Sequence, residues 1–89
     1  MSEKEIFYSI LGREIDNLLS GSPYAGLISN IVKKWVFNYI DPYVNLFIED
    51  DILQADMATA FIKEEMSAKI DNFKKKFMED INSEHNIQN

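Results

Sequence analysis

Apolar residues recur at steps of three and four from the start of the chain, and this spacing constrains the fold more than any other feature. Such steps put the residues on one face of an α-helix. Ser2 and Glu5 precede the pattern with the spacing of a capping box, which predicts where the helix begins. The stretch SGSPYAG at 20–26 predicts its end. The members of this first row are Phe7, Leu11, Ile15 and Leu18.

A second helix is predicted to begin at Ser22 and Pro23, because Ser is a good N-cap and Pro suits the first helical turn. Its apolar face is too wide for a surface helix with one neighbour, so we expect a central helix that touches two or three others. Trp35 and Tyr39 are expected in the core. The face comprises Tyr24, Leu27, Ile28, Ile31, Val32, Trp35, Val36, Tyr39 and Ile40.

The step from Asp41 to Pro42 predicts a turn, because proline biases the preceding residue away from helical angles. A short third helix, PYVNLFIE, would follow at 42–49, and Asp50 or Asp51 would cap a last helix from residue 52. That last helix has no Gly or Pro. Its apolar stripe comprises Leu53, Met57, Phe61 or Ile62, Met66, Ile70, Phe73, Phe77 and Ile81.

These elements predict an all-α protein, a small helical bundle of three to four helices with a long C-terminal helix. A chain of 89 residues favours a single domain, which we place at residues 1–82. Residues 83–89 have little apolar content, so we expect a polar tail that frays.

Composition narrows the class of protein. The net charge of −6 disfavours direct binding to nucleic acid, because the phosphate backbone dominates that affinity. Acidic residues around 41–51 disfavour an anionic membrane surface. No apolar run approaches the ~20 residues that span a bilayer, and there is no cysteine. We therefore expect a soluble cytoplasmic protein; its Ile, Asn and Lys usage is typical of an AT-rich bacterial or phage genome.

Residues that carry chemistry are scarce. The one histidine, His85, lies in the polar tail without a Glu or His at metal-ligand spacing. There is no glycine-rich phosphate loop and no nucleophile with a partner base in the sequence. We therefore expect no catalytic residue, no metal site and no cofactor, and we predict that the protein is not an enzyme.

Two sets of residues are predicted to contact other proteins. Phe37 shares its side of the second helix with polar residues, so we expect it to be exposed. With Tyr43 and Phe47 it would form an aromatic contact surface beside Asp50 and Asp51. The second half of the last helix would outrun its intramolecular partners and pair with another chain, unless a break near position 56 shortens it. Its self-association candidates are Met66, Ile70, Phe73, Phe77 and Ile81.

The leading functional hypothesis is a non-enzymatic protein-interaction module that regulates, inhibits or assembles a larger partner, with a homo-oligomer as a further outcome. One alternative is an acidic inhibitor that blocks a nucleic-acid-binding partner. In being short, acidic and predicted to form up to four helices, with tyrosine on a short third helix, the chain resembles bacterial nuclease-immunity proteins. The acids of this alternative are Glu49, Asp50, Asp51, Glu64 and Glu65. Another alternative is a structural subunit of a phage particle or similar assembly.

Overall fold

The computed structural model describes the backbone of residues 2–88 and the side chains of residues 2–82. Its elements are α1 (Glu3–Leu19), α2 (Ala25–Glu49), α3 (Met57–Phe61), a π-helical turn η1 (Ile62–Met66) and α4 (Ser67–Gln88). The last three follow one another without a break, and we call residues 57–88 the C-terminal helix. Among the residues described there is no strand. The all-α class and the long C-terminal helix are confirmed.

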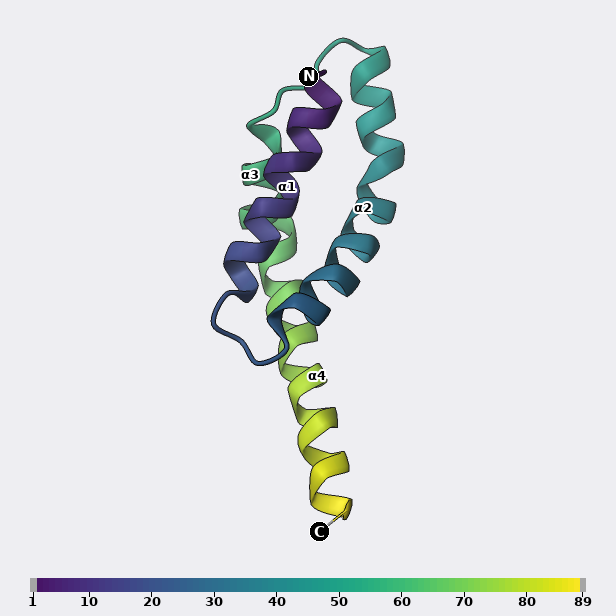
Figure 1. Ribbon diagram of the computed structural model, residues 1–89. Coiled ribbons are helices and arrows are strands. Elements are labelled where there is room, and N and C mark those ends of the chain that lie inside the picture. The colour runs from purple at the N-terminus through teal and green to yellow at the C-terminus, as the bar shows by residue number, and fades with distance from the viewer. Residues whose placement is uncertain (1, 89) are drawn as a thin grey trace.

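The molecule is elongated, with extents of 56 × 20 × 19 Å. In Figure 1 the N-terminus lies at the same end as the connection from α2 to α3. The C-terminal helix passes the α1–α2 loop and extends beyond the opposite end of the body (Figure 1). The backbone of residues 83–88 continues α4; the predicted fraying concerns the stability of this segment, and it stays a prediction.

Helix α1 begins where the capping box predicted. The Ser2 side chain accepts a hydrogen bond from the Glu5 backbone N–H at 3.2 Å. At its other end the chain turns through Gly21, whose φ of +80° lies in the left-handed region that favours glycine. The local sequence signals therefore fix both ends of α1.

The start of α2 differs from the prediction. The residue before the helix is Tyr24 with φ of 61°, and its side chain makes no capping hydrogen bond. Ser22, the predicted N-cap, instead has a buried hydroxyl without a hydrogen-bond partner among the described residues. Ser22 does not cap α2 because the loop makes one more turn, at Tyr24, before the helix begins at Ala25.

The turn predicted at Asp41 and Pro42 is also wrong, because α2 runs through Pro42 without interruption. Proline removes one backbone N–H, which normally bonds to the carbonyl four residues earlier. Ile40 and Val44 are buried on either side of it, and burying both requires the helix to continue. The predicted short helix at 42–49 is thus the last third of α2.

Asp50 and Asp51 end α2 rather than cap the next helix. The Ile52 N–H bonds to the Phe47 carbonyl at 2.9 Å, and Asp51 adopts φ of 58°. This is a Schellman-type helix end, in which one left-handed residue allows the last carbonyls to be satisfied. The C-terminal helix begins at Met57, after Asp56. Its predicted start at residue 52 was therefore five residues early.

The core consists of rows of side chains spaced four residues apart on each helix. Rows of this spacing are inclined by about 26° to the helix axis, so helices that meet along them cross at an angle. Close backbone approaches join α1 to α2 and α1 to every part of the C-terminal helix. The central helix is therefore α1, not α2 as predicted. The rows are Phe7, Leu11, Ile15 and Leu19; Ile28, Val32, Val36, Ile40 and Val44; and Ala58, Ile62, Met66 and Ile70.

One local feature keeps these rows in contact. In η1 the Ser67 N–H bonds to the Ile62 carbonyl, five residues earlier, which widens the turn. An α-helix has 3.6 residues per turn, so a row at steps of four drifts around it, and a wider turn reduces the drift. In α1, a Cβ at Gly12 would lie 3.6 Å from the Lys33 side chain and 3.8 Å from that of Phe37, which are ordinary contact distances, so the packing of α2 on α1 at this position does not require glycine.

Candidate protein-interaction surface

A second row of large apolar side chains runs along α2 beside the buried one, and about half of its surface is exposed to solvent. Its members are spaced by four residues and, at the end, by three, which aligns them on one helix face. Their exposed fractions lie between 39% and 55%. We call this set the open row; it comprises Leu27, Ile31, Trp35, Tyr39, Tyr43 and Leu46.

One edge of the open row approaches the C-terminal helix through aromatic rings. Trp35 lies 6.3 Å from Phe73 between ring centroids, and Tyr39 stacks on Phe61 at 6.4 Å. The Lys69 ammonium lies 5.8 Å from the centre of the Tyr39 ring, a cation–π distance. These rings bridge α2 and the C-terminal helix without closing the space between them.

A groove of about 340 Å³ remains between the two helices. Tyr39, Tyr43 and Phe47 line it from α2, and Phe61 and Met66 line it from the C-terminal helix. Glu65 and Lys69 contribute its charged groups. The π-helical turn therefore forms part of the wall of an open, largely apolar groove.

Phe37 does not lie on this surface. Its ring packs edge-to-face against Tyr8 with a centroid distance of 5.1 Å, and it contacts the buried core. The prediction that Phe37 is exposed is wrong, because α1 approaches α2 on that side at Gly12. Two polar residues on the same side of α2, Lys33 and Asp41, bond to α1 at the edges of this contact.

The other predicted contact residues are accessible. Tyr43 is half exposed and belongs to the open row. Phe47 is half-buried in the wall of the groove. Asp50 and Asp51 are exposed at the end of α2. The structure thus brings Tyr43 and Phe47 together, sets the two acids beyond them, and separates all four from Phe37.

The predicted self-association stripe divides into two parts. Met66 and Ile70 are buried against the core of their own chain, so the expectation that they are half-exposed is wrong. Phe73, Phe77 and Ile81 are only partly buried. The boundary arises because α1 ends at Leu19 and leaves the rest of the stripe without a helix to cover it.

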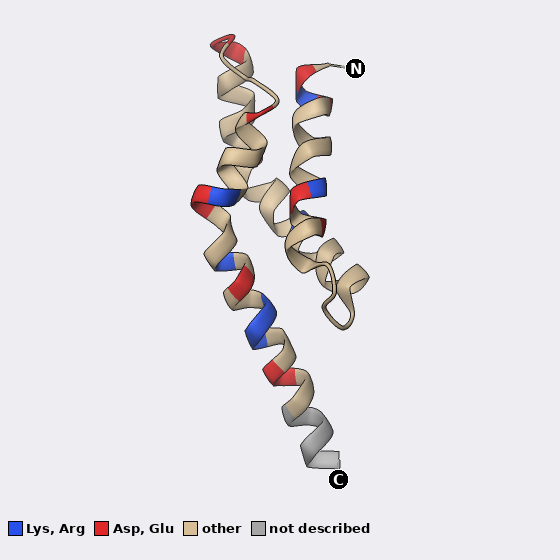
Figure 2. Ribbon diagram, turned by 90° about the vertical axis from the view of Figure 1, so that its left-hand side faces the viewer, with Lys and Arg blue, Asp and Glu red and all other residues tan. Residues whose placement is uncertain are grey.

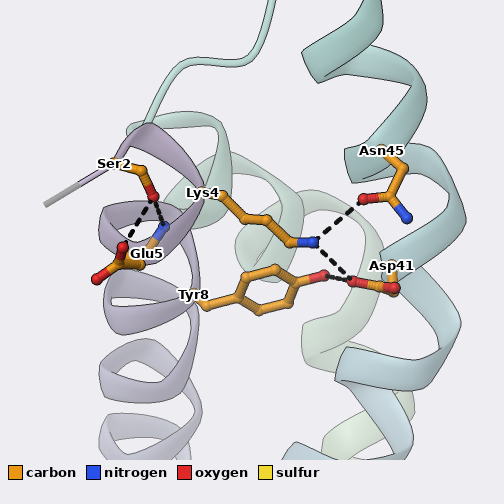
Figure 3. Close-up of polar contacts among 6 residues, drawn as sticks. All are labelled: Ser2, Lys4, Glu5, Tyr8, Asp41 and Asn45. Carbon is orange, nitrogen blue, oxygen red and sulfur yellow. Dashed lines mark hydrogen bonds and ion pairs between the residues drawn. The ribbon is translucent and has the colours of Figure 1, made fainter.

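Polar contacts fasten α1 to α2 on the side away from the open row. The Tyr8 hydroxyl donates to Asp41 at 2.5 Å, and Lys4 donates to Asn45 at 3.2 Å and lies 3.9 Å from Asp41 (Figure 3). Burial, and then the hydrogen bond to Asp41 and its negative charge, raise the pKa of the Tyr8 phenol. Tyr8 therefore remains protonated and acts as a structural donor.

A second polar cluster joins the far end of α1 to the first turns of α2. Asp16 accepts hydrogen bonds from the buried Ser29 hydroxyl and, at 2.9 Å, from Lys33. These two bonds, that of Ser29 first, lower the pKa of the Asp16 carboxyl. A hollow of about 420 Å³ lies beside them, lined also by Gly26. Because the carboxylate already accepts from both donors, the cluster ties the helices together.

The described residues contain no group of three or more His, Cys, Asp and Glu side chains that could hold a metal ion. Within the same part of the chain, no helix combines the length and the hydropathy needed to cross a bilayer. The most extensive surface feature with a chemical character of its own is therefore the open row with its groove.

Sequence reasoning missed most of the open row, because it assigned Trp35 and Tyr39 to the core. One signal could have found it. The apolar face of α2 is wide enough for several neighbours, yet α1 and one other helix are all that the described chain offers.

No family model, no curated protein and no solved structure matches this chain.

Proposed function

We propose that the protein is a non-enzymatic protein-interaction module whose contact surface is the open row of α2 with the adjoining groove. The observation that carries the proposal is the row itself: six large apolar side chains in one line, each 39–55% exposed. The largest contiguous apolar patch on a protein surface is often a functional site.

The chemistry of the row supports this function. Tyr and Trp are enriched at the energetic centres of protein interfaces, because they bury a large apolar area and keep a polar group. Three of the six residues are of these types, namely Trp35, Tyr39 and Tyr43. Helix α2 has only four charged residues in 25 positions, at 33, 34, 41 and 49, so covering the row desolvates few charges.

A photo-crosslinking experiment tests the proposal. Tyr43 is replaced by the photoreactive p-benzoylphenylalanine, which keeps an aromatic ring in the row, and the chain is irradiated in cells of the organism that carries the gene. Ser9, exposed on α1 and outside the row, is the matched control position. We expect a discrete protein adduct from position 43 and none from position 9.

The mass of the adduct identifies the partner as a second copy of this chain or as a different protein, and either result supports the module. Equal labelling at both positions, or no adduct from position 43, would contradict the proposal.

We propose further that the module acts in the cytoplasm of a bacterium, where a small regulatory, inhibitory or assembly protein of bacterial or phage origin would work. The absence of cysteine from the sequence supports a reducing compartment. The net charge of −6 supports a protein partner rather than nucleic acid.

A second candidate function, the acidic inhibitor of a nucleic-acid-binding protein, is supported by one observation. Glu3, Glu5, Glu49, Asp50 and Asp51 are all exposed, and they gather at the end of the molecule that holds the N-terminus (Figure 1). Such an end would suit a basic cleft, and binding would then weaken steeply with added salt. Partner binding that is indifferent to salt would count against this function.

A further inference from the structure

We infer that the open row is covered by a second copy of this chain, turned end for end, so that two α2 helices pack antiparallel about a two-fold axis. The inference rests on the proposed function and names the partner of the same surface. Three properties of the surface lead to it: its area, the symmetry of the row, and the distribution of charge along the molecule.

The area is of the size that a stable dimer needs. A fully exposed aromatic side chain presents about 150–250 Å², so six large side chains near half exposure present on the order of 500 Å². The partly exposed rings of Phe47, Phe61, Phe73 and Phe77 adjoin the row and enlarge this area. A standard interface takes about 800 Å² from each partner. One helix face and its flanking rings therefore suffice.

The row matches itself when it is reversed. It extends from Leu27 to Leu46, and its four inner members, at positions 31, 35, 39 and 43, are symmetric about residue 37. A two-fold axis at residue 37 places Ile31 opposite Tyr43 of the second copy, and Trp35 opposite Tyr39 of the second copy. A two-fold interface uses the same patch on both subunits, and this axis covers the whole row on each.

Charge selects the antiparallel orientation. The acidic turn at residues 49–51 lies at one end of the body, whereas the basic segment at residues 74–76 lies at the height of the α1–α2 loop (Figure 2). Among the described residues, neither segment forms an ion pair. Reversing the second copy brings its acidic turn to the basic segment of the first, twice in each dimer. A parallel dimer would set acid beside acid and base beside base, which opposes association.

The first test measures the solution mass of the full chain by sedimentation across a dilution series. We expect a dimer that dissociates on dilution, and Tyr43→Glu should raise the dimer Kd at least about tenfold, because it places a charge without a partner in the covered apolar row. Ser9→Glu adds the same charge on the exposed side of α1 and should leave the Kd unchanged. Far-ultraviolet circular dichroism verifies that both variants remain helical.

The second test determines the orientation of the two chains. Because the sequence has no cysteine, a maleimide reacts only with the cysteine that is introduced. Chains carrying Ile31→Cys and chains carrying Tyr43→Cys are mixed and treated with a short bis-maleimide. In the antiparallel dimer residue 31 of one chain faces residue 43 of the other, while the two residues 31 lie about 18 Å apart along the helices. We expect the mixed adduct to predominate, whereas a parallel dimer would link identical positions.

The third test is a charge exchange. Replacing all three lysines at 74–76 by Glu should raise the dimer Kd, and replacing residues 49–51 by Lys in the same chain should restore it. Failure of the second set to restore dimerisation would overturn the antiparallel contact.

A chain that stays monomeric at the highest concentration reached, or a dimer that Tyr43→Glu leaves intact, overturns the dimer altogether. The photo-adduct at position 43 then separates the two failures. An adduct with a different protein preserves the proposed function, and no adduct at all removes both.

Discussion

Two neighbouring rows on α2 consist of similar residues and have opposite surroundings. Ile28 in the buried row is 0% exposed, and Ile31 in the open row, three positions later, is 41% exposed. Helix α1 covers the first row, while the described part of the chain leaves about half of the surface of the second uncovered. The comparison teaches that an apolar pattern indicates which faces avoid water, but not which molecule covers them.

The largest effect expected from this comparison is the matched pair Ile28→Ala and Ile31→Ala. Truncating a fully buried Ile costs about 2–5 kcal/mol through lost burial and a residual cavity, whereas an exposed position allows water to fill the space. In urea unfolding of the dilute chain, Ile28→Ala should therefore lower the free energy of unfolding by that amount and Ile31→Ala by less than about 1 kcal/mol.

The same pair sharpens the comparison at high concentration. If a second copy covers the open row, the cost of Ile31→Ala should grow with protein concentration, because association stabilises the folded chain by mass action. Equal costs for the two variants in dilute solution would break the distinction between the rows.

A second pair reverses the order that the sequence indicates. Trp35 has the larger side chain and belongs to the predicted core, yet it lies in the open row; Phe37 packs against Tyr8. We expect Phe37→Ala to destabilise the chain by about 2–4 kcal/mol and Trp35→Ala by about half as much. Thermal unfolding followed by circular dichroism measures both, and a larger loss for Trp35→Ala would refute the assignment of the two faces.

A third pair compares two tyrosine hydroxyls. The Tyr8 hydroxyl donates to Asp41 across the covered side, whereas Tyr43 has no hydrogen bond to a described residue. Hydrogen bonds to charged groups contribute about 1.5–3 kcal/mol, and less when partly exposed, so Tyr8→Phe should cost about 1–2 kcal/mol. Tyr43→Phe should leave the free energy of unfolding unchanged. A measurable loss for Tyr43→Phe in the dilute chain would show that the open row has an intramolecular polar anchor.

The smallest effect concerns Asp16, at the margin of the covered side. Its folded-state pKa is lowered by Ser29 and Lys33, so its contribution is present above its unfolded pKa of about 3.9 and is lost as the pH falls through the folded value. Because the carboxylate is half exposed, Asp16→Asn should cost less than about 1 kcal/mol near neutral pH.

Urea unfolding of Asp16→Asn and of the unmodified chain, compared at about pH 7 and about pH 2.5, measures this difference. The gap between the two free energies of unfolding should narrow at the lower pH. A gap that persists or widens in acid would mean that the carboxylate is not the stabilising form.

Much of the fold was predictable, and the errors have a common cause. The capping box at Ser2 and Glu5, the break after Leu19 and the four-residue rows follow from local physics, so they can be deduced from the sequence. The interruption at Pro42 was predicted from an equally local rule. It failed because Ile40 and Val44 are both buried only if the helix continues, and that burial depends on a distant segment, α1.

The candidate surface was less predictable than the fold. Tyr43 and Phe47 were expected there, whereas Trp35 and Tyr39 were assigned to the core and Phe37 to the surface. Helix periodicity groups residues on faces, but the face that α1 covers depends on how α1 and α2 meet in space, which places the ring of Phe37 against that of Tyr8. Met66 and Ile70 were misplaced for the same reason, because the length of α1 decides how much of the C-terminal helix is covered.

By itself, the sequence determined that this protein is all-helical, where α1 begins and ends, and that a wide apolar face lies on α2. Local hydrogen bonding and hydrophobic periodicity act over a few residues, and both are written in the order of side chains. Only the tertiary structure decided that α1 is the central helix, that α2 passes through Pro42, and that the open row remains exposed. These outcomes depend on which segments meet in space, because burial is shared between elements far apart in the chain.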